Sequence, residues 1–281
     1  MKKFIGFLTF VFSLVILFSC EPSRDVNGDL LFGLNNEGQT GGGTTATRLL
    51  KKMISHGLND ETGEWEDETL TYNYLNNKLM SYSDESGELT SFEYSANNKI
   101  SRISSSGQTT DFQYAGGNVA MIKTDLAGVA KINSTFTYTG TKVTKSISIQ
   151  DYSAPFPMKM YFETTYEYQG ENMVKALVKT GVYLPTGELE MSPEDQDVAI
   201  TFSYDTKKSP YRLLPNEFIT YLAGFGFHGA AYFSANNFTK MTATQGGIPV
   251  ITAYTHTYDS ENYPVETKNG DEYLKYEYIK P

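Results

Sequence analysis

The chain has 281 residues, a formal net charge of −10 and one cysteine, and aromatic side chains make up 14% of it. An acidic protein is repelled by nucleic-acid phosphates, and no window of this sequence concentrates lysine and arginine, so we expect no nucleic-acid partner. A single cysteine leaves no pair for an intramolecular disulfide.

Residues 1–19 are typical of a bacterial lipoprotein signal peptide. Lys2 and Lys3 precede an apolar stretch of about 15 residues, which is shorter than the roughly 20 residues that a transmembrane helix needs. The stretch ends in Leu17-Phe18-Ser19-Cys20, which resembles a lipobox. The resemblance implies cleavage before Cys20 and acylation of Cys20, which would anchor the chain in a membrane and leave no thiol for catalysis. The alternative is an ordinary secretory signal followed by a free cysteine.

Three parts of the chain follow from this interpretation. Residues 1–19 are the signal peptide, and residues 20–47 are the lipidated cysteine and a flexible tether rich in glycine, asparagine and threonine. Residues 48–281 then form a single domain.

A short aromatic motif recurs through residues 48–281 at a spacing of about 20 residues or somewhat more. The clearest copies are Tyr72-Asn73-Tyr74, Phe92-Glu93-Tyr94, Phe112-Gln113-Tyr114, Phe136-Thr137-Tyr138, Tyr166-Glu167-Tyr168, Phe202-Ser203-Tyr204 and Tyr276-Glu277-Tyr278. The two aromatics of each copy share one face of a strand. Turns such as Asn76-Asn77 and Gly116-Gly117 follow, and their residues tolerate the positive φ of a tight hairpin. The repeat predicts one antiparallel hairpin per unit, with the aromatic face buried.

The outgoing strand of each hairpin begins with two apolar residues three positions apart. These pairs are Leu79/Tyr82, Ile100/Ile103, Val119/Ile122, Val174/Leu177 and Phe238/Met241. Residues three apart lie on opposite faces of a regular strand, so we expect a β-bulge or a sharp bend in each unit that returns both residues to the buried face.

With an opening strand at Leu49–Ser55, the units predict an all-β fold, an antiparallel hairpin meander of about 16–18 strands. A single layer must hide its aromatic face, which favours a curved sheet closing into a barrel-like or shell-like form. Leu213–Ala223 departs from the pattern and predicts one short helix near residues 215–223, with Pro215 near its start, that caps or plugs the sheet.

Two resemblances extend this interpretation. The unit Tyr94-Ser95-Ala96-Asn97-Asn98-Lys99-Ile100, followed by Gly107, resembles the YD repeat of the Rhs-type shell proteins, and Tyr-Asp pairs stand at Tyr204-Asp205 and Tyr258-Asp259. That resemblance implies that the repeats build a shell-like β-sheet. It does not imply the toxin-encapsulating function. The lipobox, tether and aromatic copies together are similar to a Bacteroides-type family of Gram-negative lipoproteins with a porin-like β fold, which brings no established activity.

Signals for catalysis and metal binding are weak. His56, His228 and His256 share no metal-ligand spacing, and no nucleophile elbow, phosphate loop or dinucleotide fingerprint is present. We therefore predict no catalytic residue, no metal and no cofactor. We expect His56 to be solvated at the end of its strand, His256 to replace a buried aromatic ring, and the acidic segments 60–68 and 188–197 to be solvated loops.

The candidate ligand-binding residues are Phe225, Phe227 and His228 in a glycine-rich loop, and Trp65, the only tryptophan. Aromatic surfaces suit sugar rings, so we expect a lipid-anchored, non-catalytic binding or scaffold module on the outer membrane of the cell envelope, with a glycan, peptide or protein partner. Alternatives are an accessory subunit of an outer-membrane complex, an envelope hydrolase, and a membrane-spanning barrel. Charges such as Glu93 on the polar strand face disfavour the last.

Overall fold

The computed structural model describes residues 48–59, 63–153, 157–224 and 229–281. These residues form eighteen strands in a single antiparallel sheet, which confirms the predicted all-β meander. The strands are β1 Leu49–Leu58, β2 Trp65–Leu75, β3 Lys78–Ser83, β4 Leu89–Tyr94, β5 Ile100–Ser105, β6 Gln108–Ala115, β7 Asn118–Leu126, β8 Ala130–Thr139, β9 Lys142–Tyr152, β10 Met158–Gln169, β11 Asn172–Tyr183, β12 Leu189–Met191, β13 Val198–Lys208, β14 Asn236–Gln245, β15 Ile248–Ala253, β16 Thr255–Tyr258, β17 Pro264–Asn269 and β18 Glu272–Ile279.

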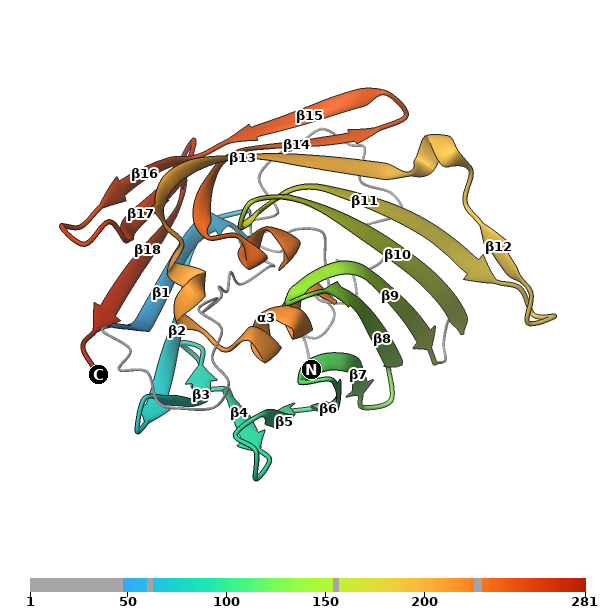
Figure 1. The fold of residues 1–281 in the computed structure, drawn as a ribbon, viewed down its shortest axis with the longest axis horizontal. Helices are drawn as coiled ribbons and strands as arrows, with labels where there is room; N and C mark the ends of the chain where they lie inside the picture. Colours follow the sequence, from blue (N-terminus) through green and yellow to red (C-terminus); the bar gives the residue numbers. More distant parts are fainter. Residues whose placement is uncertain (1–47, 60–62, 154–156, 225–228) are drawn as a thin grey trace.

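Strands that follow one another in the chain lie side by side in a ring (Figure 1). Pairing runs in sequence from β1 to β11, and β13 also pairs with β11 because the short β12 covers only the tip of that strand. β1 pairs with β2 along one edge and with the last strand, β18, along the other. Only Tyr254 separates β15, which pairs with β14, from β16, which pairs with β17. The sheet is therefore a nearly closed barrel.

Tight turns with positive φ join the two strands within a hairpin at one end of the barrel, as predicted. Asn76 and Asn77 have φ values of 51° and 63°, and Gly116 and Gly117 have values of 58° and 86°. Two consecutive residues with positive φ form the turn whose twist matches that of the flanking strands. Asparagine and glycine are placed there because other residues adopt this backbone at a cost.

The predicted bulges are present and recur at the same place in the repeat. Register shifts fall directly before the second aromatic, for example between Asn73 and Tyr74 and between Gln113 and Tyr114. The bulge returns the next inward residue to the interior, so Ile100 and Ile103 are both buried.

One predicted pair is wrong by one position. At the start of β11 the buried pair is Met173 and Ala176, whereas Val174 and Leu177 are only partly buried. The Gly170–Glu171 turn places Asn172 opposite Gln169, so the first inward residue of the strand is the one after Asn172.

The second tyrosine of most repeats ties its hairpin to a neighbouring one through its hydroxyl. The hydroxyl donates a hydrogen bond to a backbone carbonyl in five copies: Tyr74 to Leu50 at 2.8 Å, Tyr94 to Leu79 at 2.6 Å, Tyr114 to Ile100 at 2.5 Å, Tyr204 to Met173 at 2.5 Å and Tyr278 to Pro264 at 2.6 Å. Burial raises the pKa of each of these five tyrosines, which keeps the donating proton in place at neutral pH. We call this set of bonds the tyrosine ladder.

The predicted short helix is present as α3, Asn216–Ala223, between the 3-10 turns Pro210–Leu213 and Gly229–Phe233. It lies inside the ring of strands (Figure 1). Phe218 is fully buried, and its ring packs edge-on against Phe92 at 4.9 Å and stacks on Tyr82 at 5.8 Å. The helix thus plugs the barrel and covers the aromatic face of the repeats. No helix in the described residues is long and apolar enough to span a lipid bilayer.

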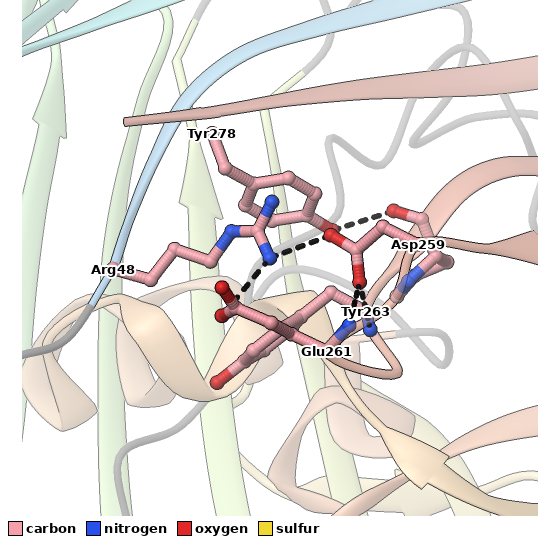
Figure 2. A network of polar contacts seen from close by, with 6 residues as sticks. Arg48, Asp259, Glu261, Tyr263 and Tyr278 are labelled. Carbon is pink, nitrogen blue, oxygen red and sulfur yellow. Dashed lines mark hydrogen bonds and ion pairs between the residues drawn. The ribbon is translucent and has the colours of Figure 1, made fainter. Parts of the chain in front are cut away.

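An arginine immediately before β1 holds the turn between β16 and β17 against the start of the barrel (Figure 2). The Arg48 guanidinium is 2.5 Å from the Asp259 carboxylate and 3.3 Å from that of Glu261. Its carbon lies 4.2 Å from the Tyr278 ring centre and 5.2 Å from that of Tyr263. Because Asp259 also accepts hydrogen bonds from the backbone of its own turn, the cluster fixes the β16–β17 turn beside β1.

Candidate ligand-binding site on the outer face of the sheet

Three aromatic rings stack across neighbouring strands on the outer face of the barrel. The His56 ring on β1 lies 5.4 Å from the Trp65 ring on β2, with an angle of 18° between the planes. It lies 4.6 Å from the Tyr273 ring on β18, with an angle of 7°. These spacings are close to the distance of about 4.8 Å between hydrogen-bonded strands, so the rings stand upright on adjacent strands. We call this set the aromatic stack.

Strand register brings the stack together. His56 lies directly opposite Tyr273 on one side and Asp67 on the other, and Trp65 follows on the same face as Asp67, two residues away. Contrary to the prediction, His56 does not end its strand, and it is only partly solvated, with 26% of its side chain exposed. β1 continues past Ser55 to Leu58, so His56 pairs on both sides and its ring is enclosed by two others.

A single carboxylate fixes the orientation of the stack. Asp67 lies 2.7 Å from Nδ1 of His56 and accepts a hydrogen bond from the Tyr273 hydroxyl at 3.0 Å. The hydrogen bond with His56 lowers the pKa of the Asp67 carboxyl, and burial together with Asp67 raises the pKa of Tyr273. The Lys275 ammonium lies 4.2 Å from the centre of the Tyr273 ring. The rings are thus held in place before any ligand arrives.

Trp65 has one covered face and one open face. His56 covers one side of the indole, yet 46% of Trp65 is exposed to solvent. β3 pairs with β2 only from Thr71 onward, so no strand among the described residues pairs with β2 beside Trp65 on the side away from β1. The open face of the indole therefore borders a step in the sheet, where a ring-shaped ligand can lie flat.

The described part of the structure does not bring the predicted site residues together. Trp65 is in the stack, whereas Phe225, Phe227 and His228, like Cys20, lie outside the residues that the structure describes. His56, Asp67 and Tyr273 were missed as site residues, because only the pairing of β1 with the distant β18 places them beside Trp65.

Other sequence predictions about polar residues have mixed outcomes. His256 replaces a buried ring, as predicted: it contacts the Thr267 hydroxyl at 2.8 Å and the Phe238 carbonyl at 3.0 Å, and burial lowers its pKa. The acidic segments are not simple loops, since 65–68 belong to β2 and 189–191 form β12. In the described part of the chain, no group of three or more His, Cys, Asp or Glu side chains is arranged to hold a metal.

Comparison with solved structures found similarity in the course of the backbone. Two solved structures resemble 78% of this chain at 13% identity: the Tc holotoxin pore of Photorhabdus luminescens with a mutated TccC3, with a TM-score of 0.31, and TcdB2–TccC3 without its hypervariable C-terminal region, with a TM-score of 0.29. The chain spans 12% of the length of each matched chain. No family model and no curated protein matches the sequence.

Proposed function

We propose that this protein is a lipid-anchored, non-catalytic binding module of the cell envelope that holds a glycan on the open face of Trp65. Cys20 carries the lipid, and residues 20–47 tether the barrel to the outer membrane. The observation that supports the binding role is the aromatic stack, in which a half-exposed indole is backed by His56 and Tyr273.

The chemistry of a sugar ring fits this arrangement. One face of a pyranose presents carbon-bound hydrogens, which pack on the negative face of an aromatic ring, while its hydroxyl groups need polar partners at the edge. Asp67 is half exposed beside the stack and can accept hydrogen bonds from those hydroxyls. Because the stack fixes the indole, binding requires little loss of side-chain entropy.

The single tryptophan makes the site directly observable. A titration of purified residues 48–281 with a panel of soluble oligosaccharides should give a saturable change in tryptophan fluorescence for at least one of them. Quenching by iodide should become weaker when that oligosaccharide is bound, because the open face of the indole is then covered. A panel that leaves both emission and quenching unchanged would reject the glycan role.

The anchoring part of the proposal has a separate test. Full-length protein should fractionate with outer membranes, and Cys20→Ala should release it into the soluble envelope fraction. A Cys20→Ala variant that stays membrane-bound after carbonate washing would contradict a tether held by lipid alone and would favour the membrane-spanning alternative.

A further inference from the structure

One strand of the barrel has a free edge. β15 pairs with β14 along one side, from Ile248 opposite Gln245 to Ala253 opposite Lys240. No strand among the described residues pairs with β15 on its other side, because β17 pairs with β16 and reaches only as far as Thr255. In Figure 1, β15 runs along the top of the ring with no strand above it. An unpaired edge presents backbone donors and acceptors that can take up a further strand.

The alternation of the backbone decides which groups of β15 face this edge. The N–H of Tyr254 donates to the Thr239 carbonyl of β14 at 2.8 Å, so Tyr254 turns its backbone toward β14. In an antiparallel pair, successive residues turn these groups alternately toward the partner and away from it. The N–H and carbonyl groups of Ile251 and Ala253, together with the carbonyl of Pro249, therefore point out of the sheet.

Pro249 marks this side of β15 as an edge and limits what can pair there. A proline has no N–H, and a sheet tolerates it where that group would face away from the neighbouring strand. An added strand consequently finds three carbonyls but only two donors, those of Ile251 and Ala253. Because both donors lie in the second half of β15, they fix the position at which a further strand can be added.

The free edge is apolar on both faces of the sheet. Ile248 is 65% exposed, Val250 is 42% exposed and Ile251 is 58% exposed. Val250 shares a face with the buried Thr252 and so lies on the inner side of the sheet, whereas Ile251 lies on the outer side. No residue of β15 is charged, although charged side chains are a common protection of exposed edges. A further strand would therefore cover apolar side chains on both of its own faces.

Acidic residues near both ends of the edge favour a basic partner. Asp271 is exposed in the β17–β18 turn, where the pairing of β17 stops. Glu194 and Asp195 are exposed in a 3-10 turn, and the Gln196 carbonyl of this turn accepts a hydrogen bond from Gln245 at the tip of the β14–β15 hairpin at 2.7 Å. A second copy of the chain would bring the same acidic turns and a net charge of −10, which disfavours self-association.

We propose that the free edge of β15 binds an extended segment of a partner protein, which adds to the sheet as a further strand. Backbone hydrogen bonds to Ile251 and Ala253 hold the segment, and the exposed side chains of Val250 and Ile251 select one with an apolar, β-branched centre. Lysine or arginine at its ends lies near the acidic turns. This edge is separate from the aromatic stack and does not depend on glycan binding.

A synthetic peptide tests the proposal on the full-length protein. The probe is a capped peptide of alternating valine and threonine with a lysine at each end, and its binding is measured by fluorescence anisotropy. We expect saturable binding that weakens as salt is added, and at least about tenfold weaker binding when glutamate replaces both lysines. The same peptide methylated on its central amide nitrogens should not bind, because it cannot donate backbone hydrogen bonds.

Ile251→Pro is the decisive variant. It removes the outward N–H of Ile251 and leaves the bonds between β15 and β14 in place, so it should fold and bind the lysine-ended peptide about tenfold more weakly. Ile251→Thr keeps the N–H and should lose less affinity. Leu89→Ala, at an exposed apolar residue of the distant β4, is the matched control and should bind like the wild type. Trp65→Ala should also leave peptide binding unchanged, which separates this edge from the glycan site.

Four results would overturn the proposal. They are the absence of saturable binding by the lysine-ended peptide, equal binding of its methylated form, unchanged affinity in a folded Ile251→Pro, and a dimer of the free protein that Ile251→Pro converts to monomers. The last result, measured by analytical ultracentrifugation, would assign the edge to a second copy of the chain. The comparison of the two peptides on the wild-type protein decides the question even where Ile251→Pro does not fold.

Discussion

The hydroxyl of Tyr94 donates a hydrogen bond to the backbone carbonyl of Leu79 at 2.6 Å, which ties the β4 strand to the start of β3. This contact explains why the second aromatic of the repeat is almost always tyrosine. A phenylalanine would fill the same volume but would leave the carbonyl without this donor. The repeated motif thus encodes both the buried face of a hairpin and its attachment to the hairpin before it.

The ladder bond makes a measurable contribution to stability. Tyr94→Phe should lower the free energy of unfolding by about 1 kcal/mol, because the Leu79 carbonyl loses its partner. Urea unfolding followed by circular dichroism measures the change. Tyr168→Phe is the matched comparison and should cost little or nothing, because the Tyr168 hydroxyl has no hydrogen-bond partner among the described residues. Equal losses in the two variants would show that the hydroxyl bond is not the source of the effect.

The Arg48 cluster holds the β16–β17 turn beside the first strand. Arg48→Met should lower the free energy of unfolding by about 1–3 kcal/mol, because it keeps the side-chain stem but leaves the largely buried Asp259 carboxylate without its cation. Chemical denaturation of the purified domain measures this loss. Arg102→Met, which removes the exposed contact with Asp111, should give no measurable change. A harmless Arg48→Met would contradict a role for the cluster in holding this turn.

The plug helix is part of the core. Phe218→Ala should destabilise the protein by about 3–5 kcal/mol, because it opens a cavity between α3 and the rings of Tyr82 and Phe92. The control is Ile248→Ala at a site that is 65% exposed, where we expect a change within about 0.5 kcal/mol. Thermal unfolding of both variants should separate them clearly. Similar midpoints would mean that the helix does not share the barrel's cooperative unit.

Alkaline pH should unfold the protein. Burial raises the pKa of Tyr138 and of Tyr152 to about 12, from an ordinary value of 10.0, and raises the pKa of the ladder tyrosines as well. A group with a raised folded-state pKa contributes its full stability below the unfolded pKa and loses it as pH rises through the folded value. The free energy of unfolding should therefore fall between pH about 10 and about 12.

Tyrosinate absorbance and circular dichroism, recorded together, check this dependence. The buried tyrosines should ionise in the same pH range in which the β-sheet signal disappears. Ionisation of all tyrosines near pH 10 with the sheet signal intact would show that the rings are accessible in the folded state.

The sequence predicted those features of the fold that depend on residues close together in the chain. Alternating aromatics, asparagine or glycine turns and the three-residue spacing of apolar pairs all act within one hairpin, so strand number, turns and bulges could be predicted from them. The misplaced pair at Val174/Leu177 shows that the local pattern can be wrong by one residue about which side chains face inward. Two neighbouring apolar residues, Met173 and Val174, both fit the pattern, and only the register set by the turn decides which one faces inward.

The candidate site depends on contacts that no local pattern contains. His56 and Tyr273 lie more than 200 positions apart in the chain, and their stacking requires the first and last strands to pair. The same holds for the tyrosine ladder, since each hydroxyl reaches a carbonyl in another hairpin. Trp65 could be nominated as an exposed aromatic, but the rings that support it could not.

Calorimetric titration of Trp65→Ala tests the glycan site most directly. The ligand is the oligosaccharide that gives the largest fluorescence change with the wild-type protein, and Tyr161→Ala on the distant β10 is the control for loss of an aromatic side chain. Loss of a central aromatic contact costs about 2 kcal/mol, so we predict that Trp65→Ala binds about 30-fold more weakly while Tyr161→Ala binds like the wild type. An unchanged affinity in Trp65→Ala would contradict the assignment of the aromatic stack as the ligand-binding surface.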